Sequence, residues 1–324
     1  MKKILLLLLL IFISIVSLFA QPATEEIKEK TVVRVASLKG PTAMGLVKLI
    51  EDTTTAPETL KNSYEFIIES APDMIVPLLA KNDVDIASIP ANLASVLYSN
   101  TGKVKVIAVN TLGVLYLVGD KSLSINSVED IKGKTIYSAG KGSTPQYALE
   151  AILKGYNLED GKDCYIEWKS EHSECVASLK KDKDALALLP QPFATAALMQ
   201  NDNLYLCADL NELWKDLTGV PLITGCTVVT TSFLENNKSA VDSFLSEYKK
   251  SATWVNSNID EASLLIEKND IIKAQVAKKA IDKCNIVVWT GEEMKKSLSI
   301  YLDALYNENP KSVGGSIPGE EFYY

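Results

Sequence analysis

Two short stretches hold the residues of this sequence that are best suited to binding a small ligand. Residues 35–50 read VASLKGPTAMGLVKLI, and residues 136–153 read IYSAGKGSTPQYALEAIL. In each stretch a β-type run ends in Lys-Gly, a Thr follows the Gly by two positions, and an apolar helical pattern begins at once. The start of a helix offers free N–H groups and a partial positive charge, so both loops can receive an anion or a carbonyl oxygen.

These stretches belong to an internal repeat. They align with an offset of 102 residues, and residues 83–100 align with residues 182–201 at an offset of 100, which matches Pro90 with Pro190. Similarity at a nearly constant spacing indicates a duplicated unit. We therefore expect two similar lobes, in which corresponding helix starts face each other across a gap and share one ligand.

The sequence contains few residues that could support nucleophilic or metal-dependent catalysis. The chain has one His, His172, and one Arg, Arg34. A zinc site, a Ser-His-Asp triad or a Cys-His pair would each need His172, and the polar segment around it, SEHSECVASLKK, predicts an exposed imidazole at a helix start. Alternation in TVVRVAS places Arg34 on a sheet face or edge rather than at a ligand. We expect no enzyme activity, no metal and no cofactor.

Composition argues against several function classes. With 324 residues, 47% of them apolar and 23% charged, the chain is long enough for two globular domains. A net charge of −8 without basic clusters argues against binding nucleic acid or anionic membrane surfaces. Five cysteines without a CxxC pair leave at least one thiol free; they allow a disulfide, and buried free thiols are equally compatible. The acids in the turns before strands are expected to be solvated, namely Asp83, Asp85, Asp182 and Asp184.

The first twenty residues, MKKILLLLLLIFISIVSLFA, have the pattern of a secretory signal peptide, with two lysines, an apolar run and small residues near Ala20. The alternative is an uncleaved membrane anchor, because the run approaches the length that spans a bilayer. No Cys follows the apolar run, so a lipid attachment is not expected. The pattern favours a freely soluble periplasmic or extracytoplasmic protein, which we expect to be a monomer.

Strand and helix patterns alternate from residue 31, which predicts α/β lobes with parallel sheets. Strands are expected at 31–37, 64–70, 85–89 and 104–111, and again at 134–139, 164–169 and 185–189, each followed by a helix except the strand at 104–111. The β-branched run 222–231 is placed to return the chain to the first lobe, and four amphipathic helices follow at 238–256, 261–268, 272–283 and 292–307. The predicted organisation is a signal peptide at 1–20, lobe 1 at 31–112 and 225–324, and lobe 2 at 113–224.

Several motifs together carry a family resemblance. A signal peptide followed by SLKGPTAMGLVKL, DVDIASIPANLAS, GKGSTPQYALEAIL, LPQPFATAAL and a terminal GEEFYY resembles a periplasmic substrate-binding protein of an ABC importer, of the nitrate, sulfonate, taurine and thiamine-precursor group. The resemblance implies a type II periplasmic-binding fold, with two α/β lobes joined by a two-strand hinge around a ligand cleft. It also implies that hinge closure near residues 110–115 and 219–226 captures a small polar, anionic or heteroaromatic ligand for an ABC permease.

The same resemblance implies the ligand-binding residues. Recognition is expected from backbone N–H groups at the helix starts, from side-chain hydroxyls and amides, and from Tyr147 or Phe193 stacking on a planar ligand. The residues that match the family's ligand loops or lie beside them are Lys39, Gly40, Pro41, Thr42, Ala43, Pro90, Ala91, Asn92, Asn110, Thr111, Gly142, Ser143, Thr144, Tyr147, Gln191, Pro192, Gly225 and Thr227.

Two other functions stay open. The same fold hosts a chorismate-dehydratase family and a pyrimidine synthase that consumes an active-site His, but the signal peptide and the expected exposure of His172 argue against both. A membrane-anchored sensor would require residues 1–20 to remain attached to the chain.

Overall fold

The computed structural model describes residues 30–324, of which Thr31–Tyr324 form one compact unit. The signal peptide expected at residues 1–20 lies outside the described residues. Within the described part, no helix is long and apolar enough to cross a membrane.

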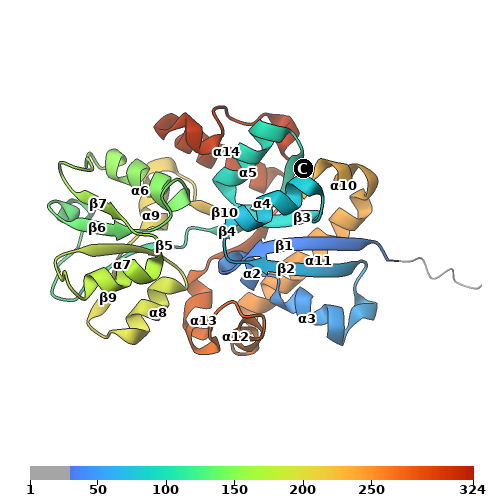
Figure 1. The fold of residues 1–324 in the computed structure, drawn as a ribbon, viewed down its shortest axis with the longest axis horizontal. Coiled ribbons are helices and arrows are strands. Elements are labelled where there is room, and N and C mark those ends of the chain that lie inside the picture. The colour runs from blue at the N-terminus through green and yellow to red at the C-terminus, as the bar shows by residue number, and fades with distance from the viewer. Residues whose placement is uncertain (1–29) are drawn as a thin grey trace, which may run out of the picture. The chain divides into compact units, whose positions relative to one another are not determined.

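The first sheet has six strands and collects segments from both ends of the unit (Figure 1). Its order is β11-β4-β10-β3-β1-β2, with β1 and β2 parallel, β1 and β3 parallel, and β10 antiparallel to both β3 and β4. We call this sheet and its helices lobe 1. The strands are β1 (Val32–Leu38), β2 (Ser63–Glu69), β3 (Ile86–Pro90), β4 (Val104–Leu112), β10 (Ile223–Thr230) and β11 (Ile286–Trp289).

The second sheet has five strands in the order β7-β6-β8-β5-β9, and with its helices it forms lobe 2. Here β6 is parallel to β7 and β8, and β5 is antiparallel to β8 and β9. Its strands are β5 (Leu115–Asp120), β6 (Thr135–Ser138), β7 (Tyr165–Trp168), β8 (Leu186–Pro190) and β9 (Leu204–Asp209).

The two sheets share one strand plan. In lobe 1 the run β2-β1-β3-β10-β4 has the same order and directions as β7-β6-β8-β5-β9 in lobe 2, and in each run the antiparallel fourth strand is the one that the chain enters from the other lobe. The chain crosses between β4 and β5 and returns between β9 and β10. This agreement is what a duplicated unit produces. It supports the repeat predicted from the sequence.

Helices cover both sheets, and the last five helices belong to lobe 1 (Figure 1). The α-helices are α2 (Pro41–Met44), α3 (Val47–Thr55), α4 (Pro72–Lys81), α5 (Ala91–Thr101), α6 (Thr144–Gly155), α7 (His172–Leu179), α8 (Phe193–Gln200), α9 (Leu210–Thr218), α10 (Thr231–Asn236), α11 (Lys238–Ser257), α12 (Ile259–Lys268), α13 (Ala274–Ala280) and α14 (Gly291–Glu308). Short 3-10 helices span η1 (Pro57–Thr59), η2 (Val128–Ile131), η3 (Ile281–Lys283), η4 (Pro310–Val313) and η5 (Glu320–Phe322).

The hydrophobic core does not stop at the lobe boundary. One buried cluster runs from Val106 of β4 through Leu117 of β5 to Trp214 of α9 and Tyr301 of α14. The rings of Trp214 and Tyr301 lie 5.5 Å apart, so helix α14 of lobe 1 packs directly on helix α9 of lobe 2. This side of the unit is held together by apolar packing.

Arg34 and Asp85 form an ion pair between neighbouring strands. Arg34 lies in β1, and its Nε and Nη2 donate to the two carboxylate oxygens of Asp85 at 3.0 and 2.6 Å. Asp85 is 4% exposed, so the expectation that it is solvated is wrong. Its charge is compensated by a partner that the local sequence does not reveal.

Candidate functional site

Helix starts from the two lobes meet crosswise. The loop before α2, Lys39 to Pro41, shares a cavity with the β8–α8 loop of lobe 2, Pro190 to Phe193. The starts of α5 and α6 touch directly, because Thr144 Oγ1 donates to Asn92 Oδ1 at 3.2 Å. The loop before α2 therefore faces the loop before α8, and the loop before α6 faces the loop before α5. The expectation that corresponding starts face each other is corrected: two units related by a two-fold axis bring non-equivalent loops together twice.

The first of these crossings encloses a cavity of about 410 Å³. This volume falls within the range of small-molecule sites. The cavity is lined from lobe 1, from lobe 2 and from the link between β4 and β5, by Lys39, Gly40, Pro41, Ser70, Val114, His172, Pro190, Gln191, Pro192, Phe193, Ile271 and Ile272. A molecule held here would contact both lobes at once.

Gln191 places a hydrogen-bond donor at this cavity. Its side chain is 1% exposed, and Oε1 accepts from the hydroxyl and the backbone N–H of Thr195 at 2.7 and 3.3 Å. These two donors fix the orientation of the amide, which leaves Nε2 without a partner among the described residues. A buried amide nitrogen of this kind normally has a partner, so a ligand oxygen would satisfy it.

His172 also lines the cavity, as the first residue of α7. The imidazole is half-buried and lies 5.0 Å from the ring of Phe193, so the predicted exposure is wrong. Burial lowers the pKa of His172 below its ordinary value, and the ring is therefore largely neutral at pH 7. A neutral imidazole can accept a proton, and its Nδ1 has no partner in the described part of the chain.

Charge at the cavity is supplied by one lysine. Among the described residues that line it, Lys39 is the one permanent cation, and its Nζ lies 2.8 Å from Oδ2 of Asp270. Asp270 precedes Ile271 and Ile272, which add an apolar wall from the turn between α12 and α13. The cavity thus combines a cation, a neutral base, an amide donor and apolar surface.

Several predicted ligand residues form hydrogen bonds with one another and do not line the cavity. Asn110 Nδ2 donates to Thr227 Oγ1 at 2.9 Å, and the hydroxyl of Thr111 donates to Asn110 Oδ1 at 2.9 Å. Gly225 leaves no room for a side chain, since a Cβ there would lie 2.5 Å from Asn110 Oδ1 and 2.8 Å from Cγ2 of Thr42. All of these residues except Thr42, which is half-buried, are buried. In this arrangement they join β4 to β10, the two strands next to the links between the lobes.

Most of the other predicted residues lie at the second crossing or beside it. Asn92 and Thr144 are buried, and Asn92 Nδ2 donates to the carbonyl of Ser312 at 3.2 Å. Gly142 is exposed and its N–H donates to Gln146 Oε1, while the hydroxyl of Ser143 donates to the carbonyl of Gly140. None of these four predicted residues lines the cavity. The remaining predicted residues do not line it either: Ala43 is buried in α2, Pro90 and Ala91 lie at the start of α5, and Tyr147 of α6 is half-buried.

Sequence reasoning missed part of the wall and misjudged His172. Ser70, Val114, Ile271 and Ile272 line the cavity without having been predicted. The pattern from residue 272 predicts one helix, whereas α13 begins at Ala274 and the preceding turn faces the cavity. A helix-breaking Asn-Asp pair at 269–270 is the signal that could have revealed the turn.

The thiols offer no activated nucleophile. All five cysteines are free, and four are buried. Burial raises the pKa of the Cys164, Cys175 and Cys207 thiols to about 11, which keeps them protonated at neutral pH. Among residues 30–324, no group of three or more His, Cys, Asp or Glu residues is arranged to hold a metal ion.

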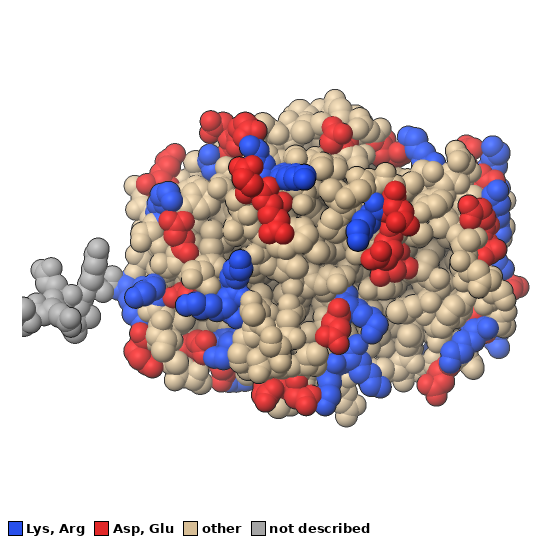
Figure 2. Space-filling model, turned by 180° about the vertical axis from the view of Figure 1, so that it is seen from behind, with Lys and Arg blue, Asp and Glu red and all other residues tan. Residues whose placement is uncertain are grey.

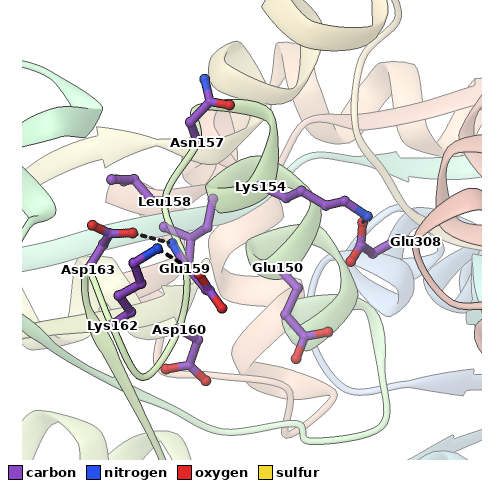
Figure 3. A pocket seen from close by; sticks show the side chains of 10 residues that line it. Glu150, Lys154, Asn157, Leu158, Glu159, Asp160, Lys162, Asp163 and Glu308 are labelled. Atoms are coloured by element: carbon purple, nitrogen blue, oxygen red, sulfur yellow. Dashed lines mark hydrogen bonds and ion pairs between the residues drawn. The ribbon is translucent and has the colours of Figure 1, made fainter.

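A larger cavity, of about 580 Å³, lies at the end of α6 in lobe 2, and Glu308 of α14 in lobe 1 forms part of its lining (Figure 3). Its lysines pair with its own acids: Lys154 lies 2.8 Å from Glu308, and Lys162 lies 3.2 Å from Glu159. On the face shown in Figure 2, basic and acidic side chains are interspersed in the same way. None of the residues that line this larger cavity holds a buried polar atom without a partner, whereas Gln191 Nε2 and His172 Nδ1 at the interlobe cavity do, so the interlobe cavity is the better candidate site.

Comparison with solved structures establishes the fold. An ABC transporter protein from Parabacteroides distasonis aligns with a TM-score of 0.77 at 24% identity, covering 91% of this chain and 99% of that one. The periplasmic aliphatic sulphonate binding protein from Escherichia coli aligns with a TM-score of 0.73 at 15% identity, covering 90% and 96%. The predicted type II periplasmic-binding fold is confirmed, and with it the resemblance to such binding proteins at the level of the fold.

The family comparison corrects the expected function. No curated protein matches the chain. A family model described as menaquinone biosynthesis, however, matches residues 41–307. That family includes enzymes such as chorismate dehydratase, so the expectation that the protein is not an enzyme is wrong. The alternative of a dehydratase-like enzyme agrees better with this match than the transport hypothesis does. With most of its length covered by that model, the chain belongs to the menaquinone biosynthesis family.

Proposed function

We propose that the protein is an enzyme that binds a small unsaturated ring carboxylate of the chorismate class between its lobes and removes water from it. The observation that carries the proposal is the neutral imidazole of His172, placed against Phe193 in a cavity that both lobes line. Membership of the menaquinone biosynthesis family supports it.

The proposed reaction needs one base and a dry site. His172 accepts the proton from a ring carbon, the electron pair of that C–H bond forms the new double bond, and the neighbouring C–O bond breaks. The departing hydroxide takes the proton back from the imidazolium and leaves as water, so the imidazole is regenerated. In chorismate this elimination makes the ring aromatic, which favours the product. General acid–base catalysis of this kind typically contributes about 10²- to 10⁴-fold to the rate.

The other residues of the cavity position the ring. Phe193 is 46% exposed and offers a flat face for stacking. Gln191 Nε2 and Lys39 are the donors for carboxylate oxygens, and Ile271 and Ile272 exclude water from the opposite wall.

Incubation of the full chain with chorismate tests the proposal, with mass spectrometry detecting a product lighter by one water. We expect turnover by the wild type and a rate at least about 100-fold lower for His172→Asn. Phe193→Leu is the matched control, because it keeps the imidazole and removes the ring; it should weaken binding more than it slows the bound substrate. Binding of chorismate without any dehydrated product would refute the reaction.

A second function is capture of a ligand outside the cytoplasm and its delivery to an ABC permease. The secretory pattern of residues 1–20 favours it, as does the structural similarity to an ABC transporter protein and to a periplasmic sulphonate binding protein. Cell fractionation of the native protein, combined with recovery of the bound ligand unchanged, would support this function. A protein found wholly in the cytoplasm would remove it.

A further inference from the structure

We propose that Asp270 occupies Lys39 in place of a ligand carboxylate and thereby limits how strongly the cavity prefers an anionic ligand over a neutral one. This inference deepens the proposed function and rests on the binding of a carboxylate in the interlobe cavity. The ligand group that it names is a ring carboxylate paired with Lys39, with Asp270 as a specificity-determining residue.

The lining of the cavity leaves one group that can neutralise an anion. Lys39 is its permanent cation, and the imidazole of His172 is largely neutral because burial lowers its pKa. Within residues 30–324, no carboxylate side chain lines the cavity, and the other lining side chains are a hydroxyl, an amide, an aromatic ring and apolar groups. Lys39 can therefore neutralise one ligand carboxylate, and the second carboxylate of chorismate would depend on neutral donors such as Gln191 Nε2.

Lys39 already has a partner, but one that is easily exchanged. Its Nζ lies 2.8 Å from Asp270 Oδ2, and the Asp270 side chain is 96% exposed. The hydrogen bond from Lys39 is the main cause of the lowered pKa of Asp270. An ion pair with one arm in water contributes little stability, because solvent and salt screen it. A carboxylate inside the cavity is shielded from water and would attract the same ammonium group more strongly.

The position of Asp270 links this exchange to the wall of the site. Asp270 has a left-handed backbone with φ of 54°, and the next two residues, Ile271 and Ile272, line the cavity. The nearby Lys273 pairs with Glu267 at 3.1 Å and does not line the cavity, so it does not take the place of Lys39 there. Asp270 consequently competes with the ligand from the rim of the same turn that forms the apolar wall.

Titration of the full chain with benzoate and with benzamide, its neutral isostere, tests the inference. Asp270→Asn should tighten benzoate binding about two- to fivefold and leave benzamide within experimental error. Lys39→Met should weaken benzoate at least fivefold, and in that background Asp270→Asn should have no further effect. Asp260→Asn is the matched control, because Asp260 pairs with Lys278 at 2.5 Å on the same helix pair and does not line the cavity.

Three results would overturn the inference: equal responses of benzoate and benzamide to Asp270→Asn, the same effect from Asp260→Asn, or no binding of benzoate to the wild type. Chorismate turnover is measured separately. If turnover is absent while the benzoate pattern holds, the proposed reaction fails and the charge selection stands. If turnover occurs without the benzoate pattern, the reaction stands and the charge selection fails.

Discussion

Replacing Gln191 by Glu separates the two ends of one buried side chain. Oε1 accepts two hydrogen bonds from Thr195, and a carboxylate can accept both in the same place. Nε2, which has no partner among the described residues, becomes an oxygen that cannot donate. Gln191→Glu therefore keeps the internal contacts and removes the donor that we assign to the ligand.

The expected magnitude follows from that donor. A hydrogen bond to a charged group contributes about 1.5–3 kcal/mol, which corresponds to roughly 10- to 140-fold in Kd. An ionised carboxylate at this position would add repulsion of an anionic ligand, so the loss for benzoate or chorismate should reach at least the upper part of this range. Isothermal titration at pH 7 measures it, and thermal unfolding of each variant confirms that the fold is intact.

Two further variants locate the effect. Gln191→Met removes the donor without adding charge, and the excess loss of Gln191→Glu over it measures the repulsion. Thr195→Val removes one partner of Oε1 and leaves Nε2 in place, so its binding loss should be the smallest of the three. Ligand affinity of a folded Gln191→Glu variant within twofold of the wild type would refute the assignment of Nε2 to the ligand.

Two more predictions concern the base and the buried ion pair. If neutral His172 is the base, kcat/KM for chorismate should stay level from pH 8 to below 6.5 and fall at more acidic pH, because the lowered pKa delays protonation; a flat acid limb would contradict this role. Arg34→Met should lower the free energy of unfolding in urea by about 2–3 kcal/mol, somewhat below the usual cost of orphaning a buried charge because the Arg34 side chain is 38% exposed. Lys154→Met, which removes a surface ion pair with Glu308, is its control and should cost at most about 1 kcal/mol, and equal losses from the two variants would show that Asp85 needs no partner.

Local features of the site could be predicted from the sequence. The residue types of the Lys-Gly and Pro loops predict where strands end and helices begin, because turn chemistry and periodicity act over a few residues. The family resemblance then singles out residues of these loops, and Lys39, Gly40, Pro41, Gln191 and Pro192 among them line the cavity. The type II fold followed from the same patterns and from the family resemblance.

Features that depend on distant partners could not be predicted. The polar surroundings of His172 suggested exposure, but the side chain that covers it, Phe193, belongs to a different helix. The sequence around Asp85 suggests a solvated turn residue, but Arg34 of β1 lies beside Asp85 and pairs with it. In both cases the burial or pairing of the side chain depends on a residue that is close in space but lies in another segment, so the local sequence does not predict it.

The break in the repeat explains why one crossing holds a cavity and the other does not. Duplication alone predicts two equivalent crossings, one between the loops before α2 and α8 and one between the loops before α6 and α5. The C-terminal helices have no counterpart in lobe 2, and they fill one crossing but not the other. Tyr301 of α14 approaches the hydroxyl of Thr144, and the carbonyl of Ser312 accepts from Asn92, so this crossing is filled. At the other crossing the turn before α13 contributes only an apolar wall, and the cavity remains open between the lobes. The candidate cavity therefore lies where the appended helices leave the duplicated halves apart.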